Sequence, residues 1–425
     1  MFSPVSALLP SKHFPSLFYI FMSILEELNE KTNWQDFLAY KIEKSHLSKR
    51  DQAFYINFIE NQHYKTITDN IEKSGFCFSI PEKRLINKHG KGKKRVVYTF
   101  SEQENMVLKL ISYLFYRYDD AQPCNCYSFR RNYGAKKAIV NLTREKGIAK
   151  KYSCKLDIKD YFNSIDVDLL LPMLYKLLFD DEPTFRFLEK LLTLDRALFN
   201  GEIIAEKRGA MAGIPVSQFF ANLYLAEMDR FFLKAGVLYA RYSDDIIFFA
   251  DNNQALAEYL ETVKTFLAKH HLELNPEKVK VTEPNEKWDY LGVTFDNGKI
   301  GLSRTTMKKI KGKIRRKARS IYRWKIRKGA DDKKAMTVFS RSVNKKFFGK
   351  GGEDEFSWAR WFFPLITVDN DLKIIDAYVQ EHKRFVKSGR FSKANYRIRY
   401  SELKDCGYIS LVNKFHHFKK TGLVN

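Results

Sequence analysis

The sharpest feature in the pattern of apolar and polar positions is a strand–turn–strand segment at residues 239–249. Two runs rich in apolar residues flank Asp244 and Asp245, so the pattern predicts two buried strands with the acids at the turn between them. Paired carboxylates at a strand turn can hold a divalent cation next to phosphate. Taken alone, the pair is equally compatible with an ordinary acidic β-turn.

Residues 155–166 predict another strand with an acid at its end. β-forming residues lead into Asp157, and a turn then leads to a helix that begins near Val167. An acid at a strand end, with neighbouring carbonyls exposed, suits a metal ligand. The alternative is a helix cap, but Asp160 or Asp166 fits that role better than Asp157.

Residues 208–225 predict a glycine-rich turn followed by an amphipathic helix. Gly213 and Pro215 lie in the turn, and Ser217 is a plausible N-cap. Glycines let a backbone approach a nucleotide closely, and a helix start offers free N–H groups to anions. A well-made loop-to-helix junction would look the same. Further on, residues 288–295 predict one strand with a glycine bulge.

A strongly cationic helix is predicted from Arg304 to Lys328, where the chain holds 13 basic residues and no acid. Five apolar residues recur there at helical spacing, namely Met307, Ile310, Ile314, Ile321 and Trp324. The helix would therefore have one apolar and one cationic face. Uncompensated cations repel one another, which favours a phosphate partner over a solvated surface helix. Residues 355–425 are mostly helical in pattern.

Composition agrees with a nucleic-acid partner and bounds the other possibilities. The 425 residues are 44% hydrophobic, enough for a large core and two or three subdomains, and carry a formal net charge of +24. The five cysteines have no paired spacing, which argues against a disulfide framework or a zinc knuckle. Cys124 and Cys126 are expected to be ordinary buried residues.

The N-terminal segment carries no clear targeting signal. The apolar stretch from Phe14 to Leu25 contains Pro15 and is too short to span a bilayer. We therefore expect no membrane partner and a cytoplasmic chain. Residues 1–21 are expected to be either dispensable or the result of a translation start assigned too far upstream.

The order and spacing of these segments resemble the palm of a reverse transcriptase. Asp157 resembles motif A, residues 213–217 motif B and residues 242–245 motif C. Residues 274–278 resemble motif D, and residues 290–295 the primer-grip motif E. Upstream, residues 81–98 look like fingertip strands, and residues 127–134 resemble the Gly-Phe-Arg finger motif of group II intron and retron enzymes.

One difference from the usual motif B narrows the resemblance to a subgroup of reverse transcriptases. Met211, Ala212 and Gly213 stand where group II intron and retron enzymes usually carry Pro-Gln-Gly, so the Gln that helps to position template and nucleotide is missing. This looks more like the abortive-infection and unknown-group bacterial reverse transcriptases, several of which are phage-defence proteins. Residues 400–412 also resemble the tail of those enzymes.

The resemblance implies an α+β fold, a right-hand polymerase with an antiparallel palm sheet, a helical thumb and a helical C-terminal subdomain. The expected divisions are an N-terminal helical extension (1–60), fingers and palm (61–300), a basic thumb (301–350) and the C-terminal subdomain (351–425). The implied function is RNA-directed DNA synthesis in the bacterial cytoplasm, on a bound noncoding RNA and in antiphage defence. The sequence does not set the oligomeric state.

Roles for individual residues follow from the same resemblance. Two Mg²⁺ ions, or Mn²⁺, would be held by Asp157, Asp244 and the Ile158 carbonyl, with Asp245 assisting and Lys278 as a candidate proton donor. Phe162 would exclude the ribose 2′-hydroxyl. Nucleotide contacts would come from Lys88, Lys94, Arg95, Asp160, Tyr161, Phe162, Gly213, Pro215 and Ser217. RNA template and primer would meet Arg130, Arg131, Leu291, Gly292, Lys308, Lys311, Arg315, Arg316 and Arg319.

Two alternatives stay open. One is a polymerase of the same fold that works without a template or primes on its own side chain, which the lost Gln and the many tyrosines permit. The other is an RNA-dependent RNA polymerase, against which the aromatic ring of Phe162 argues.

Overall fold

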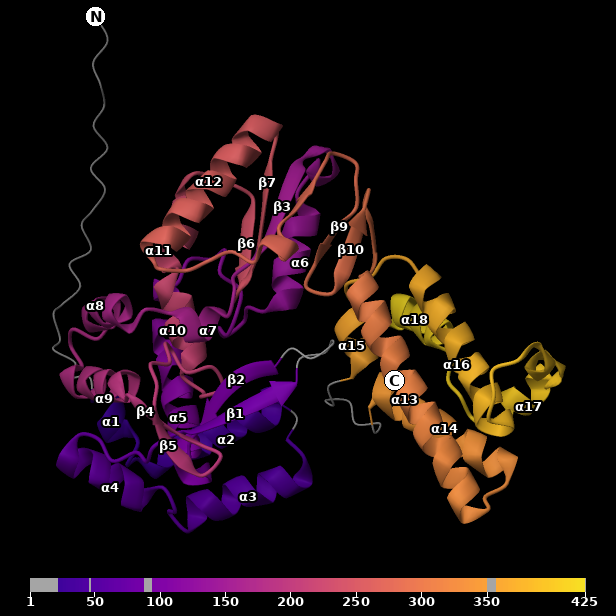
Figure 1. Cartoon of the computed structure of the whole chain (residues 1–425), viewed down its shortest axis with the longest axis horizontal. Helices are drawn as coiled ribbons and strands as arrows, with labels where there is room; N and C mark the ends of the chain where they lie inside the picture. Colours follow the sequence, from indigo (N-terminus) through magenta and orange to yellow (C-terminus); the bar gives the residue numbers. More distant parts are fainter. Residues whose placement is uncertain (1–21, 46, 88–93, 350–356, 425) are drawn as a thin grey trace, which may run out of the picture.

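The computed structural model describes residues 22–45, 47–87, 94–349 and 357–424 (Figure 1). In this view, fingers and palm form one part of the molecule, and the helices from α13 onward form a second part beside it. The strands β9 and β10 lie between the two parts (Figure 1). The predictions for Lys88 and for residues 1–21 concern positions outside the described residues.

In the described part of the chain, four helices precede the first strand, and their apolar faces enter the same core as the fingers and palm. That core runs from Ile24 to Leu272, so it has no break at the predicted boundary near residue 60, which stays a prediction. The helices are α1 (Ile24–Glu27), α2 (Lys31–Ser45), α3 (Lys49–Glu60) and α4 (Lys65–Ser74).

The fingers contain a four-stranded sheet in the order β2-β1-β4-β5, in which the predicted fingertip strands β1 and β2 pair antiparallel. Its strands are β1 (Glu82–Asn87), β2 (Lys94–Thr99), β4 (Arg196–Phe199) and β5 (Glu202–Ala205). The helices that lie between β2 and β4 along the chain, of which α6 packs against the palm, are α5 (Glu102–Leu114), η1 (Phe115–Ala121), α6 (Ala135–Arg144), η2 (Ile148–Lys150), α7 (Tyr161–Ser164), α8 (Val167–Leu177) and α9 (Glu182–Thr193).

The palm is an antiparallel sheet in the order β6-β7-β3-β8. Its strands are β3 (Tyr152–Asp157), β6 (Tyr239–Tyr242), β7 (Asp245–Ala250) and β8 (Lys280–Thr282). The helical segments that accompany it are α10 (Ser217–Tyr224), α11 (Ala226–Lys234), α12 (Asn253–Lys269) and η3 (Pro276–Lys278).

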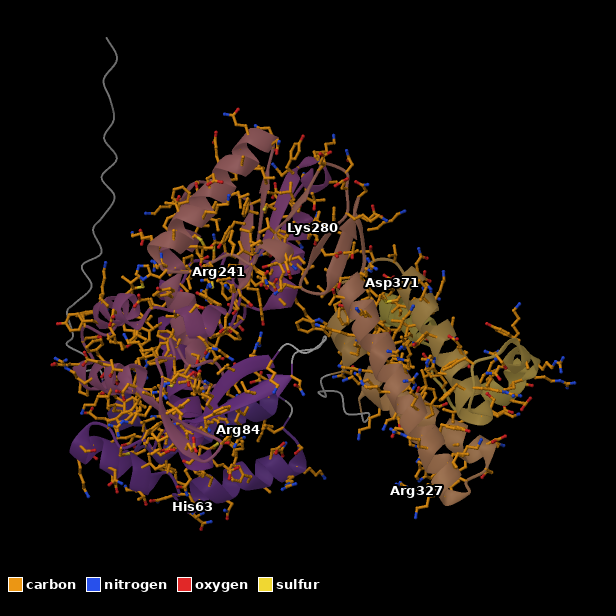
Figure 2. All side chains as sticks on the ribbon, in the orientation of Figure 1. His63, Arg84, Arg241, Lys280, Arg327 and Asp371 are labelled. Atoms are coloured by element: carbon orange, nitrogen blue, oxygen red, sulfur yellow. The ribbon has the colours of Figure 1, made fainter. Side chains whose placement is uncertain are left out.

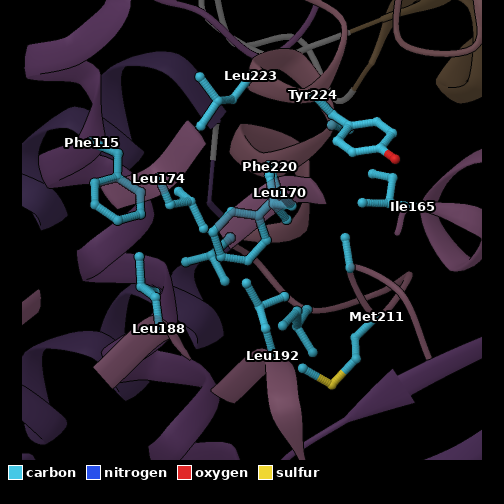
Figure 3. Close-up of a cluster of buried hydrophobic side chains, with 14 of the residues drawn as sticks. Phe115, Ile165, Leu170, Leu174, Leu188, Leu192, Met211, Phe220, Leu223 and Tyr224 are labelled. Carbon is cyan, nitrogen blue, oxygen red and sulfur yellow. The ribbon is translucent and has the colours of Figure 1, made fainter. Parts of the chain in front are cut away.

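The side chains of β7 point alternately into two separate hydrophobic cores. Ile246 and Phe248 face the core that contains the fingers, whereas Ile247 and Phe249 face a second core that extends into the thumb. Within the first core, Phe220 of α10 lies among leucines of α8 and α9, with Met211 at its edge (Figure 3). The segment that carries the acids is therefore packed on both faces.

A small sheet in the order β11-β10-β9 connects palm and thumb. The prediction of one bulged strand over residues 288–295 is wrong, because Leu291 and Gly292 both have positive φ and form a tight turn between two strands. A glycine suits either arrangement, so the sequence pattern did not separate them. The strands are β9 (Trp288–Tyr290), β10 (Val293–Asp296) and β11 (Lys299–Leu302).

The predicted cationic helix is confirmed as α13 (Arg304–Lys328), which is capped by Ser303. Its buried residues include Ile310, Ile314 and Ile321. The C-terminal part is helical as expected, and follows as α14 (Asp332–Phe348), α15 (Trp358–Phe362), α16 (Asn370–Ser388), η4 (Lys393–Arg397), α17 (Tyr400–Lys404) and α18 (Leu411–Thr421).

These elements confirm the predicted α+β class, with an antiparallel palm sheet and a helical thumb. Burial corrects one minor prediction, since Cys126 is buried but Cys124 is exposed. Among the described helices, none combines the length and the apolar character that crossing a membrane requires.

Candidate active site

The palm sheet brings the three predicted acids together at one end of adjacent strands. Asp157 at the end of β3 lies opposite Asp245 at the start of β7 in the strand register. The Ile158 N–H donates to the Asp244 carbonyl at 3.2 Å. Residues that are about 90 positions apart in the sequence thus form one carboxylate cluster.

The cluster concentrates negative charge. Burial, followed by the carboxylates of Asp245 and Asp157, raises the pKa of Asp244 to about 6. The other two acids have ammonium partners: Lys278 Nζ lies 2.6 Å from Asp157 Oδ1, and Lys155 Nζ lies 3.4 Å from Asp245 Oδ1. The predicted proton donor Lys278 therefore reaches the site directly.

The resemblance implies two Mg²⁺ ions at this site, and the oxygen donors of the carboxylate cluster can be compared with what Mg²⁺ requires. Over the described ranges, no three His, Cys, Asp or Glu side chains converge into a cage that would hold a cation unaided. Mg²⁺ is usually bound by one or two carboxylates together with waters and substrate phosphates, rather than by an all-protein cage. Hard oxygen donors and crowded carboxylates fit such a shared site.

A buried polar network supports the turn that carries Asp244. Ser243 adopts a left-handed conformation with φ of +60°, and its N–H donates to Ser128 Oγ at 3.0 Å. Ser128 Oγ in turn donates to Asn222 Oδ1 at 2.8 Å. Arg241, which Figure 2 labels in the palm, is fully buried and pairs with the equally buried Asp229 at 2.5 Å.

Sequence reasoning missed all four supporting residues of this network, Ser128, Asn222, Asp229 and Arg241. The available signal was a charged residue at a position where the strand pattern requires burial, because an arginine in a buried strand needs a buried partner.

The glycine-rich loop packs tightly against the fingers. Gly213 has a φ of +112°, and a Cβ there would lie 2.8 Å from the Tyr98 carbonyl oxygen. Pro215 follows in the turn before α10. The prediction for Ser217 is wrong: Val216 is the N-cap residue, and buried Ser217 donates to the Met211 carbonyl at 2.6 Å, so its side chain is unavailable to a nucleotide.

Motif A places two of its three candidate residues toward solvent. Asp160 is exposed, with a φ of +44°, and Phe162 is half-buried at the edge of the first core. The Tyr161 side chain is buried and its hydroxyl donates to the Ala221 carbonyl at 2.5 Å, so the predicted nucleotide contact of this residue stays a prediction for its backbone alone. Lys94 and Arg95 are exposed on β2.

The two finger arginines differ. The prediction that Arg130 contacts nucleic acid is wrong, because its buried guanidinium donates to the carbonyls of Asp119, Pro123 and Cys126 at 2.6 to 3.0 Å. The Arg131 side chain is exposed and lies over the rings of Tyr113 and Tyr116, 4.8 and 4.9 Å from their centres. Only Arg131 is placed to meet a ligand.

Cationic cavities follow the thumb helix away from the acids. One of about 480 Å³ joins Asp245 to the turn at Leu291 and Gly292, and also to Lys313 of α13. A second, of about 630 Å³, lies against α13 and is lined by Arg304, Met307, Lys308, Lys311, Arg315 and Tyr378. Arg316 and Arg319 are exposed on the same helix. A basic surface thus extends from the carboxylate cluster along the thumb.

Comparison with known proteins agrees with this site. Residues 86–295 match the family described as reverse transcriptase (RNA-dependent DNA polymerase). This central segment, which holds the carboxylate cluster, is therefore a reverse transcriptase domain.

Among curated proteins, the chain is similar to bacterial retron reverse transcriptases. It is 27% identical to the retron Mx65 enzyme of Myxococcus xanthus over 41% of this chain and 42% of that protein. It is 22% identical to the retron Ec86 enzyme of Escherichia coli over 39% and 49% respectively. The matches thus span about half the length of these relatives or less, and the narrower resemblance to abortive-infection enzymes stays a prediction.

Solved structures that resemble the chain include telomerases. The apo telomerase of Candida tropicalis has 13% identity and a TM-score of 0.45, over 94% of this chain and 87% of that one. A form truncated from its C-terminal domain has 15% identity and a TM-score of 0.43, over 53% and 55% respectively.

Proposed function

We propose that this chain is an RNA-directed DNA polymerase that adds deoxynucleotides to a primer by two-metal phosphoryl transfer. The observation that carries the proposal is the carboxylate cluster at the meeting point of β3 and the β6–β7 turn, within a reverse transcriptase domain. The raised pKa of Asp244 supports it, because such crowding of charge is relieved by a cation.

Asp157, Asp244 and the Ile158 carbonyl would hold two Mg²⁺ ions, or Mn²⁺, with Asp245 assisting. When bound, the metals would activate the primer 3′-hydroxyl and stabilise the leaving pyrophosphate. Exposed Lys94 and Arg95 on the fingers would neutralise triphosphate charge. Lys278, 2.6 Å from Asp157, would hold a proton for the leaving group.

The proposed binding of template, primer and nucleotide rests on the basic surface and on Phe162. Cations along α13 would bind the phosphates of a template–primer duplex, and the turn at Leu291 and Gly292 would support the primer end. The half-buried ring of Phe162 would collide with a ribose 2′-hydroxyl, which favours deoxynucleotides. A bound noncoding RNA template, a bacterial cytoplasmic location and a role in antiphage defence rest on resemblance alone.

The test is incorporation of deoxynucleotides by the purified protein with Mg²⁺, on a primed RNA template and on any RNA that co-purifies. Asp244→Asn is the control for the carboxylate cluster. DNA that matches the template and is absent from the control is the expected result. No product on either RNA would contradict the proposal.

Untemplated or protein-primed synthesis remains the second candidate, because Ala212 stands where relatives carry Gln and both its backbone polar groups are bonded within the protein. Product sequence that is unrelated to the added template would favour it. Incorporation of ribonucleotides in preference to deoxynucleotides would instead favour an RNA-dependent RNA polymerase.

A further inference from the structure

Asn163 links three segments that surround the candidate nucleotide site. Its Oδ1 accepts a hydrogen bond from the Ala212 N–H at 3.1 Å, and its Nδ2 donates to the Val96 carbonyl at 3.3 Å. The same amide lies 3.5 Å from Asp160 Oδ2. One side chain, directly after Phe162, therefore connects motif A to the glycine-rich loop and to the fingers strand β2.

The loop that Asn163 holds has no free space on either side. The Ala210 N–H donates to the Phe162 carbonyl at 2.8 Å, and a Cβ at Gly209 would lie 2.8 Å from that same oxygen. On the other side, the Tyr98 N–H donates to the Ala212 carbonyl at 2.8 Å. The backbone that carries the Phe162 ring is thus fixed by direct contact with the loop.

We propose that Asn163 is a positioning residue that fixes the Phe162 ring and thereby sets discrimination between deoxyribonucleoside and ribonucleoside triphosphates. The inference rests on the proposed function, since it concerns the sugar of the incoming nucleotide. Residue 212 of the loop is an alanine, so the loop has no polar side chain of its own at this position. The Asn163 amide, reaching in from motif A, supplies the polar contact that orders the loop.

The experiment compares Asn163→Ala with wild type, using Phe162→Ala as the reference for loss of the aromatic ring. Ser164→Ala is the matched control, because Ser164 Oγ contacts only the Lys159 carbonyl, at 3.4 Å, and not the loop. The measured quantity is kcat/KM for a deoxynucleotide divided by kcat/KM for its ribonucleotide, on a primed template.

Counting only the hydrogen bond that Asn163 accepts from the loop at Ala212, its loss predicts a fall in this ratio of about three- to tenfold for Asn163→Ala, and no change for Ser164→Ala. The fall should come mainly from improved use of the ribonucleotide. An unchanged ratio, with both substrates used equally less well, would overturn the inference and leave Asn163 a purely structural residue. Wild-type protein that incorporates neither substrate would instead overturn the proposed function.

Amide hydrogen exchange adds a readout that does not depend on turnover. Asn163→Ala removes the acceptor for the Ala212 N–H, whereas Ser164→Ala leaves it in place. We expect exchange at residues 209–213 to quicken in Asn163→Ala and to stay near wild type in Ser164→Ala. Equal protection in wild type and Asn163→Ala would show that Asn163 does not order the loop, and would overturn the inference.

Discussion

Asp229→Asn tests whether a buried ion pair holds the carboxylate turn in place. Arg241 donates to both oxygens of Asp229 at 2.5 to 3.1 Å, and the Tyr239 hydroxyl donates to the same carboxylate at 2.8 Å. Arg241 also reaches the Ser243 carbonyl at 3.4 Å, next to Asp244. Burial has the largest single effect and lowers the pKa of Arg241, but the neighbouring groups, chiefly the Asp229 carboxylate, together outweigh it and hold the pKa well above its ordinary value.

The expected magnitude follows from burial. Both side chains are 0% exposed, so the substitution leaves a guanidinium in the core without a counter-charge. Breaking one partner of such a pair costs about 3–5 kcal/mol. The free energy of unfolding, measured by urea titration at pH 7, should fall by this amount, and incorporation should fall with it because the turn loses its support.

Glu227→Gln on the same helix is the matched control. Glu227 pairs with Lys269 at 3.7 Å, but both side chains are exposed, so its loss should cost less than about 1 kcal/mol. Replacing both buried partners, as Asp229→Leu with Arg241→Met, should recover much of the loss because no unpaired charge remains. Equal, small losses for Asp229→Asn and Glu227→Gln would refute the reasoning.

Three further predictions concern the site itself. In wild type, the pKa of the Asp244 carboxyl is about 6 in the folded protein, whereas its ordinary value is 3.8. Without metal, Asp244→Asn should therefore raise the free energy of unfolding at pH 7 by up to about 3 kcal/mol. Near pH 4 the same substitution should change the free energy of unfolding little. Wild-type stability is therefore lost as pH rises through this window, and a pH-independent difference in urea titrations would contradict the assignment. Lys278→Gln should lower kcat about 100-fold with little change in KM, whereas a raised KM at unchanged kcat would show a role in binding alone. Lys308→Gln with Arg315→Gln should reduce the salt dependence of duplex binding by about two ions, and an unchanged slope would place the duplex elsewhere.

Local patterns predicted the thumb and the acidic turn well. The helix Arg304–Lys328 has the predicted bounds, because helical spacing of apolar residues and a run of cations are both properties of the segment alone. The strands around Asp157 and Asp244 were predictable for the same reason. The two acids meet because of the order of the strands in the sheet. This order was predicted from the family resemblance and could not be predicted from the spacing of the residues.

Burial decided the outcome for three predicted site residues. Arg130 lies in a motif rich in cations and aromatics, but three backbone carbonyls take its guanidinium into the interior. Ser217 and Tyr161 likewise bond to carbonyls from neighbouring turns of the palm. Each polar group looks equally available in the sequence, because its partner is set by tertiary packing rather than by its neighbours in the chain.

The same packing explains how a palm can keep an acid whose ionisation opposes folding. Lys278 and Lys155 pair with Asp157 and Asp245, but burial and the repulsion from these two carboxylates still raise the pKa of Asp244. The positions of the acids are set from behind, by the Asp229–Arg241 pair and the Ser128–Asn222 hydrogen bonds, which contain no catalytic candidate. Those groups are buried and hydrogen-bonded, so they tie the turn to a rigid core. They thereby offset, from a distance, the free-energy cost of ionising Asp244 in the folded protein. The β6–β7 hairpin therefore joins a stable buried ion pair, through Arg241, to the acidic cluster, through Asp244 and Asp245.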